Sequence, residues 1–331
     1  MHHWGDVQAD MGSESIYRLF TLRTEMVSLF NKFEIGNHNY TKSTEDKQRA
    51  DNLTLVLASL SSLSEIIWSG YIPRNISNIS WPYLKRLVIR ESLDTRQCLL
   101  VMARCPMIEE IVILHLTNST HDPTLPVVDL PRLRSLNLKG DTGKLLDQLV
   151  LPSLRSLDVT PPMDDKALER LGTRSSCNLF HLCLFADKRP LPTISEWNAL
   201  EYLQSACCQT LRSLHITPAT TDTFFRNLTW KTDGETGNQY LPDLVELSAR
   251  SYTTDGIVSE MVASRWHTQG KGNSPACLVF LNIHQMIYAR RMVKGDLVTL
   301  PLHSYTRDKA VLGELAAQGL TLTNGLRFNQ Q

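Results

Sequence analysis

The sequence predicts an α/β solenoid with a parallel sheet on its concave face and helices or irregular returns outside. Three observations lead to this prediction. A nine-residue phrase recurs along the chain, its last residues alternate between apolar and other types, and the segments between phrases show helical spacing. Repeats with a period of about 20–50 residues are typical of architectures in which each unit buries its apolar side against its neighbours.

The phrase has apolar residues at its first, fourth, seventh and ninth positions and often Pro at its second. Two clear copies are Leu130–Leu138 and Leu151–Val159. The fourth residue, which we call the anchor, is apolar in nine copies: Leu63, Leu84, Ile108, Leu133, Leu154, Leu179, Leu211, Leu244 and Leu278. The residues three and five positions after the anchor are also apolar in every copy. These three columns indicate one core that continues from repeat to repeat.

The second half of each phrase predicts a β-strand. Its apolar residues recur at every second position, which is the period of a strand with one buried face. In five copies a Pro lies two residues before the anchor, as Pro131 and Pro152 do. Pro is tolerated there because the strand's hydrogen-bonded part has not yet begun.

The segments between phrases predict helices. Thr193–Glu196 has the pattern of a capping box that opens a helix, and Asp255–Trp266 places apolar residues on one helical face. We expect shorter helices over Asp94–Arg104 and Pro162–Leu171, and one turn or two over Asp141–Leu149. Anchors are separated by intervals from 21 residues (Leu63 to Leu84) to 34 residues (Leu244 to Leu278), enough for one strand and one return.

This pattern divides the chain into three parts. Residues 1–59 are expected to form an N-terminal helical cap over Ser13–Phe30 and a polar loop over Asn31–Arg49. Residues 60–283 carry about nine irregular coils. Residues 284–331 are expected to form a C-terminal cap, with a helix over Arg307–Ala317 and a strand over Leu320–Leu322.

The composition narrows the classes of partner and the compartment. Lys and Arg total 34, as do Asp and Glu, so the chain has no net charge with which to hold a nucleic acid. No apolar run approaches the ~20 residues of a membrane-spanning helix, and no secretory signal is evident. We expect neither nucleic-acid nor membrane binding, and a cytoplasmic or nuclear location.

The seven cysteines are expected to be free thiols in a reducing compartment. Cys105 and Cys208 occupy a column that Leu fills in other copies, and a buried thiol packs as a small hydrophobe. The neighbouring pair Cys207 and Cys208 is expected to have one side chain inside and one outside.

The sequence contains no motif of an enzyme that we can assign. It lacks the Gly-x-Ser-x-Gly, His-Glu-x-x-His and Gly-Lys-Ser/Thr patterns of hydrolases, zinc proteases and phosphate loops. Its ten histidines are scattered. We therefore expect no enzymatic activity, no cofactor and no metal site.

What remains is a surface. The residues two, four and six positions after each anchor should form outward columns, with neighbouring strands about 4.8 Å apart. Such a broad strip of mixed polarity suits an extended protein partner better than a small molecule, which prefers an enclosed apolar pocket. The candidate partner-binding residues are Arg86, Arg90, Glu110, Asn137, Lys139, Asp158, His181, His215, Thr217, Glu246, Arg250 and His284.

The phrase and its strand–return unit resemble leucine-rich repeats, specifically the irregular repeats of fungal F-box proteins. Besides the phrase, Ala103–Ile111 and Met261–Trp266 carry the resemblance, which covers about Leu60–Asn324. In that family the repeats bind the substrate, and a separate N-terminal F-box docks the Skp-type adaptor of a cullin ubiquitin ligase. Met1–Ser59 lacks the Leu-Pro-x-Glu-Leu/Ile opening of an F-box, so we do not expect this chain to bind a Skp-type adaptor.

Two functions stay open at this point. The first is a protein-recognition module of unknown partner, as in the substrate-binding arm of an F-box-type ligase receptor. The second is a structural or degenerate repeat protein with no role in a ligase.

Overall fold

The structure is a computed structural model, and it forms two compact units. Unit 1 comprises Met1–Cys177 and unit 2 comprises Asn178–Gln331, and each is described by itself. The structure describes residues 6–9, 31–35, 48, 51–52, 54–55, 57–58, 60–69, 72–73, 76–117, 125–160, 166–185, 196–231, 240–251, 253–266, 275–285, 288–293, 296–301 and 305–323.

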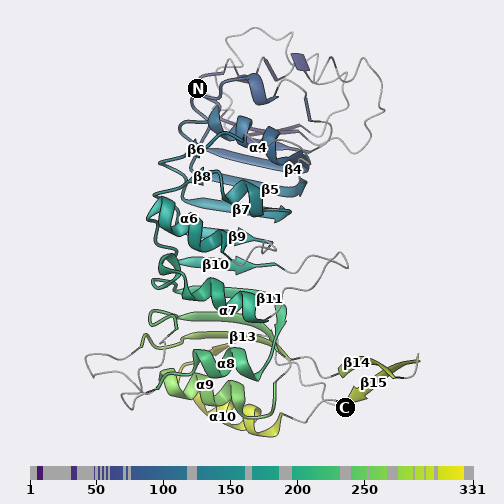
Figure 1. Ribbon diagram of the computed structural model, residues 1–331, viewed down its shortest axis with the longest axis vertical. Coiled ribbons are helices and arrows are strands. Elements are labelled where there is room, and N and C mark those ends of the chain that lie inside the picture. Colours follow the sequence, from purple (N-terminus) through teal and green to yellow (C-terminus); the bar gives the residue numbers. More distant parts are fainter. Residues whose placement is uncertain are drawn as a thin grey trace. The chain divides into compact units, whose positions relative to one another are not determined.

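Unit 1 contains a parallel sheet whose strands follow one another in chain order (Figure 1). The strands are β1 (Asp6–Ala9), β2 (Lys32–Ile35), β3 (Glu65–Trp68), β4 (Arg86–Asp94), β5 (Glu110–Thr117), β7 (Ser135–Gly140) and β9 (Ser156–Val159). A second, two-stranded parallel sheet pairs β6 (Val128–Asp129) with β8 (Leu149–Val150). The helical segments are η1 (Ile76–Asn78), α4 (Thr95–Ala103), α5 (Gly143–Leu146) and α6 (Ala167–Ser175).

Unit 2 repeats this plan. Its parallel strands are β10 (His181–Leu184), β11 (Ser213–Thr220), β12 (Glu246–Ser251), β13 (Phe280–Gln285) and β16 (Thr321–Leu322). Its helical segments are α7 (Glu196–Gln204), η2 (Ala206–Cys208), α8 (Asp222–Leu228), α9 (Ile257–Trp266) and α10 (Thr306–Ala317). The antiparallel hairpin of β14 (Tyr288–Val293) and β15 (Asp296–Pro301) was not predicted.

The register confirms the predicted core columns. In unit 1, Leu87, Ile111, Leu136 and Leu157 are consecutive register partners, and each is at most 3% exposed. In unit 2, Leu182, Leu214, Leu247 and Leu281 do the same, each at most 1% exposed. The helices cover the face into which these columns point (Figure 1). The α/β class and the parallel sheet are therefore as predicted.

A tight turn leads into each strand, and the phrase explains it. Pro131 lies in the turn that precedes β7, and Pro152 lies in the turn that precedes β9. The anchors Leu133 and Leu154 donate their N–H groups to the carbonyls of Leu130 and Leu151, each at 3.2 Å. Pro suits the second position of such a turn because its φ is already close to the required value.

Register shifts interrupt several of the predicted outward columns after the fifth residue following the anchor, although Arg250 and His284 remain register partners. Between β4 and β5 the register shifts after Ile89 and Ile113, and between β11 and β12 it shifts after Ile216. Ala219, not Thr217, is therefore the register partner of Arg250, and the expected alignment of Thr217 with Arg250 is wrong. Bulges of this kind bend a strand and shift its register, and here the pairing resumes after them at Ser92 and Ala219.

The start of the sheet also differs from expectation. Lys32–Ile35 falls in the predicted polar loop, but it is strand β2 and pairs in parallel with β3, with Phe33 opposite Ile66. Val27–Ile35 has the apolar positions of a phrase with Phe30 as its anchor, but it has no Pro and its first residues were assigned to a helix, and so the phrase search missed it. The predicted helix over Ser13–Phe30 lies outside the described residues.

Most predicted helices are present. Asp94 caps α4 by accepting a 2.7 Å hydrogen bond from the N–H of Gln97, which completes a capping box. The helices α5, α9 and α10 occur in the predicted segments, α6 begins within Pro162–Leu171 but extends to Ser175, and β16 follows α10 as expected. The capping box at Thr193–Glu196 falls largely outside the described residues, and α7 begins at Glu196. Helix α8 was not predicted.

The cysteines are free thiols, as predicted. Burial raises the pKa of Cys105 to about 12, so this thiol is protonated and unreactive at neutral pH. The prediction for the adjacent pair is wrong, because Cys207 is 2% and Cys208 is 0% exposed. They lie in η2, whose tight winding allows both side chains to turn inward with the sulfurs 4.0 Å apart.

Candidate functional site

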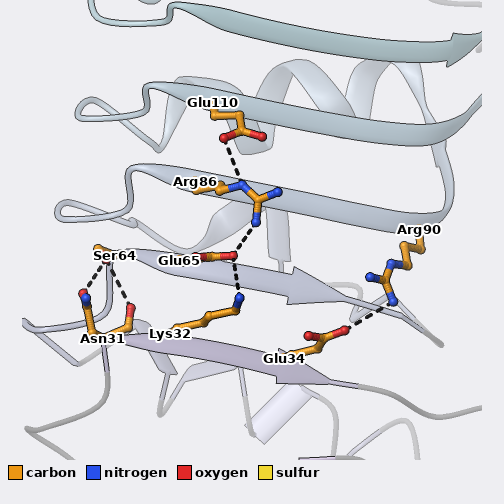
Figure 2. Close-up of polar contacts among 8 residues, drawn as sticks. All are labelled: Asn31, Lys32, Glu34, Ser64, Glu65, Arg86, Arg90 and Glu110. Atoms are coloured by element: carbon orange, nitrogen blue, oxygen red, sulfur yellow. Dashed lines mark hydrogen bonds and ion pairs between the residues drawn. The ribbon is translucent and has the colours of Figure 1, made fainter. Parts of the chain in front are cut away.

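The outward face of unit 1 carries a row of alternating charges across four neighbouring strands. Glu65 on β3 accepts from Lys32 on β2, with 3.3 Å between Nζ and Oε1, and also from Arg86 on β4. Arg86 in turn donates from Nε to Glu110 on β5 at 2.9 Å. Figure 2 shows these four side chains in line, one from each strand. We call this row the charge ladder.

The register of the strands produces this ladder. Lys32, Glu65, Arg86 and Glu110 are consecutive register partners, so each charge faces opposite charges on the strands beside it. Partial burial of Arg86 lowers its pKa, but the hydrogen bonds and charges of Glu110 and Glu65 outweigh that effect and raise it. Arg86 is therefore charged at neutral pH.

A second ion pair lies beside the ladder. Arg90, at the end of the regular part of β4, places Nη1 3.3 Å from Oε1 of Glu34 on β2. Ile67 on β3 is the register partner of Glu34, and Val88 on β4 is the register partner of Ile67. Both lie on the same outward face, yet each is only 6% exposed. The column four residues after the anchor is therefore apolar and buried at Ile67 and Val88, within a face that is of mixed polarity.

Farther along unit 1 the outward face becomes polar without alternating charges. Asn137 on β7 donates from Nδ2 to Oδ2 of its register partner Asp158 on β9 at 2.9 Å. Lys139 is half-buried and lies opposite the bulge in β5, next to Gly140. Gly140 has φ +115°, and a Cβ there would lie 2.2 Å from the carbonyl oxygen of Leu116, so the bulge requires glycine.

Unit 2 presents a different outward face. His181 on β10 has Nδ1 3.1 Å from Oγ of Ser213 on β11, and Thr217 donates from Oγ1 to the carbonyl of Leu184 at 3.2 Å. Glu246 and Arg250, both on β12, are exposed, whereas His215 is half-buried. His284 aligns with Arg250 by register. The structure thus brings the predicted residues onto one face within each unit.

The His181–Ser213 contact does not make a hydrolase site. In register the order is His181, Ser213, Glu246, so the serine rather than the histidine lies between the other two. A nucleophile–base–acid relay needs the histidine in the middle, where its second nitrogen is oriented by the acid. The described residues also contain no group of three or more His, Cys, Asp or Glu side chains that could hold a metal ion.

Phrase-based reasoning missed a column at the start of the strands. The residue directly after the anchor accepts backbone hydrogen bonds from the next coil, two in most copies and one at Val279, and we call these residues the entry column. In unit 1 the column is polar throughout: Asn31, Ser64, Lys85, Glu109 and Arg134. In unit 2 it is mainly apolar: Phe180, Arg212, Val245 and Val279. The missed signal was a change of residue type at one fixed position of the phrase.

No protein-family model and no curated protein matches this chain. Among solved structures, a Bacteroides fragilis protein determined by the Northeast Structural Genomics Consortium is similar, with 13% identity and a TM-score of 0.44. The alignment covers 77% of this chain and 70% of the other. Over the part of the chain that the structure describes, no helix combines the length and the apolar character that crossing a membrane requires.

Proposed function

We propose that this chain is a protein-recognition module of the leucine-rich-repeat kind, whose outward sheet face is the concave binding face of a solenoid. The observation that carries the proposal is the separation of roles along each strand. In β12, Leu247 and Ala249 are buried, while Glu246 and Arg250 are exposed on the other face. The core therefore does not need these outward side chains, and they can be used for a partner.

The nature of the face favours a protein partner over an enzymatic reaction. Its side chains project from neighbouring strands about 4.8 Å apart and form a broad strip, which suits an extended protein partner better than a small molecule that prefers an enclosed apolar pocket. The described residues offer no nucleophile–base–acid relay and no metal-binding cluster, so nothing there favours catalysis over binding. Binding is also the common use of curved repeat surfaces.

The resemblance to F-box proteins extends this proposal to the substrate-binding arm of a ubiquitin ligase receptor. We propose at the same time that this chain does not itself bind a Skp-type adaptor. An F-box presents packed helices, whereas the described strands β1 and β2 of the N-terminal region add to the sheet. A pull-down of the purified chain with a purified Skp-type adaptor tests this; stoichiometric capture would contradict it.

A structural repeat protein is the second candidate, and one observation favours it. In unit 1 the carboxylates of Glu65 and Glu110 are paired with Arg86 of the same face. A face that neutralises its own charges has fewer groups left for a partner. If no variant of the outward face changes the capture of any protein, this second candidate is the better one.

The experiment is a comparison of two doubly substituted chains by affinity capture and mass spectrometry. Lys139→Glu with Arg250→Glu changes the outward faces, and Lys144→Glu with Arg226→Glu makes the same change of charge at exposed positions on α5 and α8. We expect specific partners to be lost with the first pair and kept with the second. Equal capture by both pairs would contradict the proposal, provided both chains melt like the wild type.

A further inference from the structure

Unit 2 exposes an unusual run of apolar side chains at the start of its strands. Among its described residues the two exposed large apolar side chains are Phe180 and Val279, at 41% and 45%. Both belong to the entry column, as does the half-buried Val245. Phe280, the next residue after Val279, is half-buried on the adjacent outward position. We call Phe180, Val245, Val279 and Phe280 the apolar stripe.

The backbone holds the stripe in fixed order. Val245 donates its N–H to the carbonyl of Arg212, and Val279 donates to that of Val245, both at 2.9 Å. Arg212 lies between Phe180 and Val245 in the column and stacks over the Phe180 ring, with 5.6 Å from its Cζ to the ring centroid. Three strand spacings therefore separate Phe180 from Val279, a span of about 14 Å.

Glu246 gives the stripe its electrostatic character. It is exposed, follows Val245 on β12, and has Ser213 and Phe280 as register partners on either side. In unit 1, by contrast, the carboxylates in the same column have cations as register partners. Arg212 is nearby, but its guanidinium is stacked on Phe180, and Asp243 in the preceding turn adds a further exposed negative charge.

We infer that the apolar stripe binds an extended protein segment in which a Lys or Arg lies between apolar residues. This inference rests on the proposed function and specifies its partner. Apolar side chains of the segment cover Val245, Val279 and Phe280, and its cation pairs with Glu246. A span of about 14 Å corresponds to four or five residues of extended chain. Aromatic residues are enriched at interface hot spots, and here Phe280 lies next to Glu246, whose charge would pair with the cation of the partner.

The test is a selection of random seven-residue peptides displayed on phage against the purified full chain. We expect enriched peptides to carry Lys or Arg with apolar residues two positions away on both sides. Fluorescently labelled copies are then titrated against wild type, Glu246→Lys and the matched control Glu260→Lys, which reverses an exposed charge on α9. Affinity should fall about tenfold or more with Glu246→Lys and stay within about twofold with Glu260→Lys.

A charge swap sharpens the result. Replacing the cation of the peptide with Glu should weaken binding to the wild type and restore binding to Glu246→Lys. The absence of basic–apolar peptides from the selection, or equal affinity for wild type and Glu246→Lys, would overturn the inference. If other peptides are enriched and depend on Lys139 and Arg250, the proposed function survives without the stripe. If enriched peptides respond to no outward-face substitution, both proposals fail.

Discussion

In unit 1 the carboxylates of the outward face have cations as register partners, whereas in unit 2 Glu246 lies between Ser213 and Phe280. The two units share the same apolar columns behind these faces. The difference shows that the columns determine the stacking of strands, while the outward positions are free to take either role. Unit 1 uses them to link its own strands, whereas Glu246 of unit 2 has no cation as a register partner.

Unit 2 also has polar links in its helical layer. Asp255 accepts hydrogen bonds from the N–H groups of Arg307 and Asp308, at 3.0 and 2.9 Å, and so caps α10 from a distant segment. Asp308 in turn accepts a 2.8 Å bond from the N–H of Ser259 in α9. Tyr305, at the N-cap position of α10, has φ +42° and forms no side-chain cap of its own. The two last helices therefore depend on each other's carboxylates.

The buried Arg265 provides a second polar link in the helical layer of unit 2. It is 1% exposed, and it donates to the carbonyls of Leu228, Leu241 and Tyr240 at 2.8, 2.9 and 2.7 Å. Its guanidinium thus joins the end of α8 to the turn before β12. Leu241 has φ +51°, a backbone conformation that residues other than glycine rarely adopt. The hydrogen bond from Arg265 to its carbonyl helps to hold this conformation.

The largest expected effect comes from a charge in the core columns. Leu136→Asp or Leu157→Asp in unit 1, and Leu247→Asp in unit 2, should each lower the free energy of unfolding by about 4 kcal/mol or more, because the carboxylate is buried without a partner. Circular dichroism and chemical denaturation measure this. Ser156→Asp, one position away on the outward face of β9, is the control and should stay near wild type. Wild-type melting of the core variants would refute the columns.

Arg265→Met should destabilise unit 2 by about 3 kcal/mol, since three buried carbonyls lose their donors. Burial lowers the pKa of Arg265 to about 10, so the side chain is charged at neutral pH. Arg265→Lys keeps the charge but lacks the planar fork that reaches three acceptors, and it should recover only part of the loss. Hydrogen exchange should rise in β12 and α8, and unchanged exchange would disprove the role of this residue.

Asp255→Ala should cost about 1–2 kcal/mol, the usual value of a helix cap. Burial of Asp255 raises its pKa, but hydrogen bonds from Asp308, Arg307 and Thr306 outweigh that effect and lower it. A depressed carboxylate pKa stabilises the fold above the unfolded pKa of about 4, and this stabilisation is lost as the pH falls through the folded pKa. The difference in stability between wild type and Asp255→Ala should therefore shrink below pH 4. A constant difference would contradict the cap.

The smallest effect is expected for the charge ladder. Arg86→Ala should lower stability by at most about 1 kcal/mol, because half-exposed ion pairs gain little beyond their hydration. The loss should shrink further in 1 M salt, where charges are screened within about 3 Å. Lys144→Ala, a cation on α5 without a carboxylate partner among the described residues, serves as the control and should show no salt dependence. A large loss that salt does not change would instead indicate a packing role for Arg86.

Much of the fold could be predicted because the phrase repeats its chemistry at fixed positions. Leu136 and Leu157 were assigned to one column from sequence alone, and they are register partners. Strand β2 escaped because Ser13–Phe30 was assigned to a helix, so that Phe30 was not recognised as the anchor of the Lys-Phe-Glu-Ile segment. The bulges after Ile89 and Ile216 also escaped, since a register shift depends on how two chains leave the sheet and not on either segment alone.

The candidate site was predicted as a set of positions but not as a set of contacts. Arg86 and Glu110 were expected to be available to a partner, yet they pair with each other. A periodic pattern shows which side chains share a face, but the pairing of charges also needs the strand order and the missed strand β2. The apolar entry column of unit 2 could have been found by comparing Phe180, Val245 and Val279 with Lys85, Glu109 and Arg134.

The most direct test of this account is a lysine scan of β12, in which residues 246 to 250 are replaced one at a time. Melting temperature and capture of a partner lost with the outward-face pair described above are measured for each chain. We expect the effects to alternate along the strand. Leu247→Lys and Ala249→Lys should lower the melting temperature, whereas Glu246→Lys and Ser248→Lys should melt near wild type and lose the partner. Loss of stability at every position, or retained binding at every stable one, would contradict it.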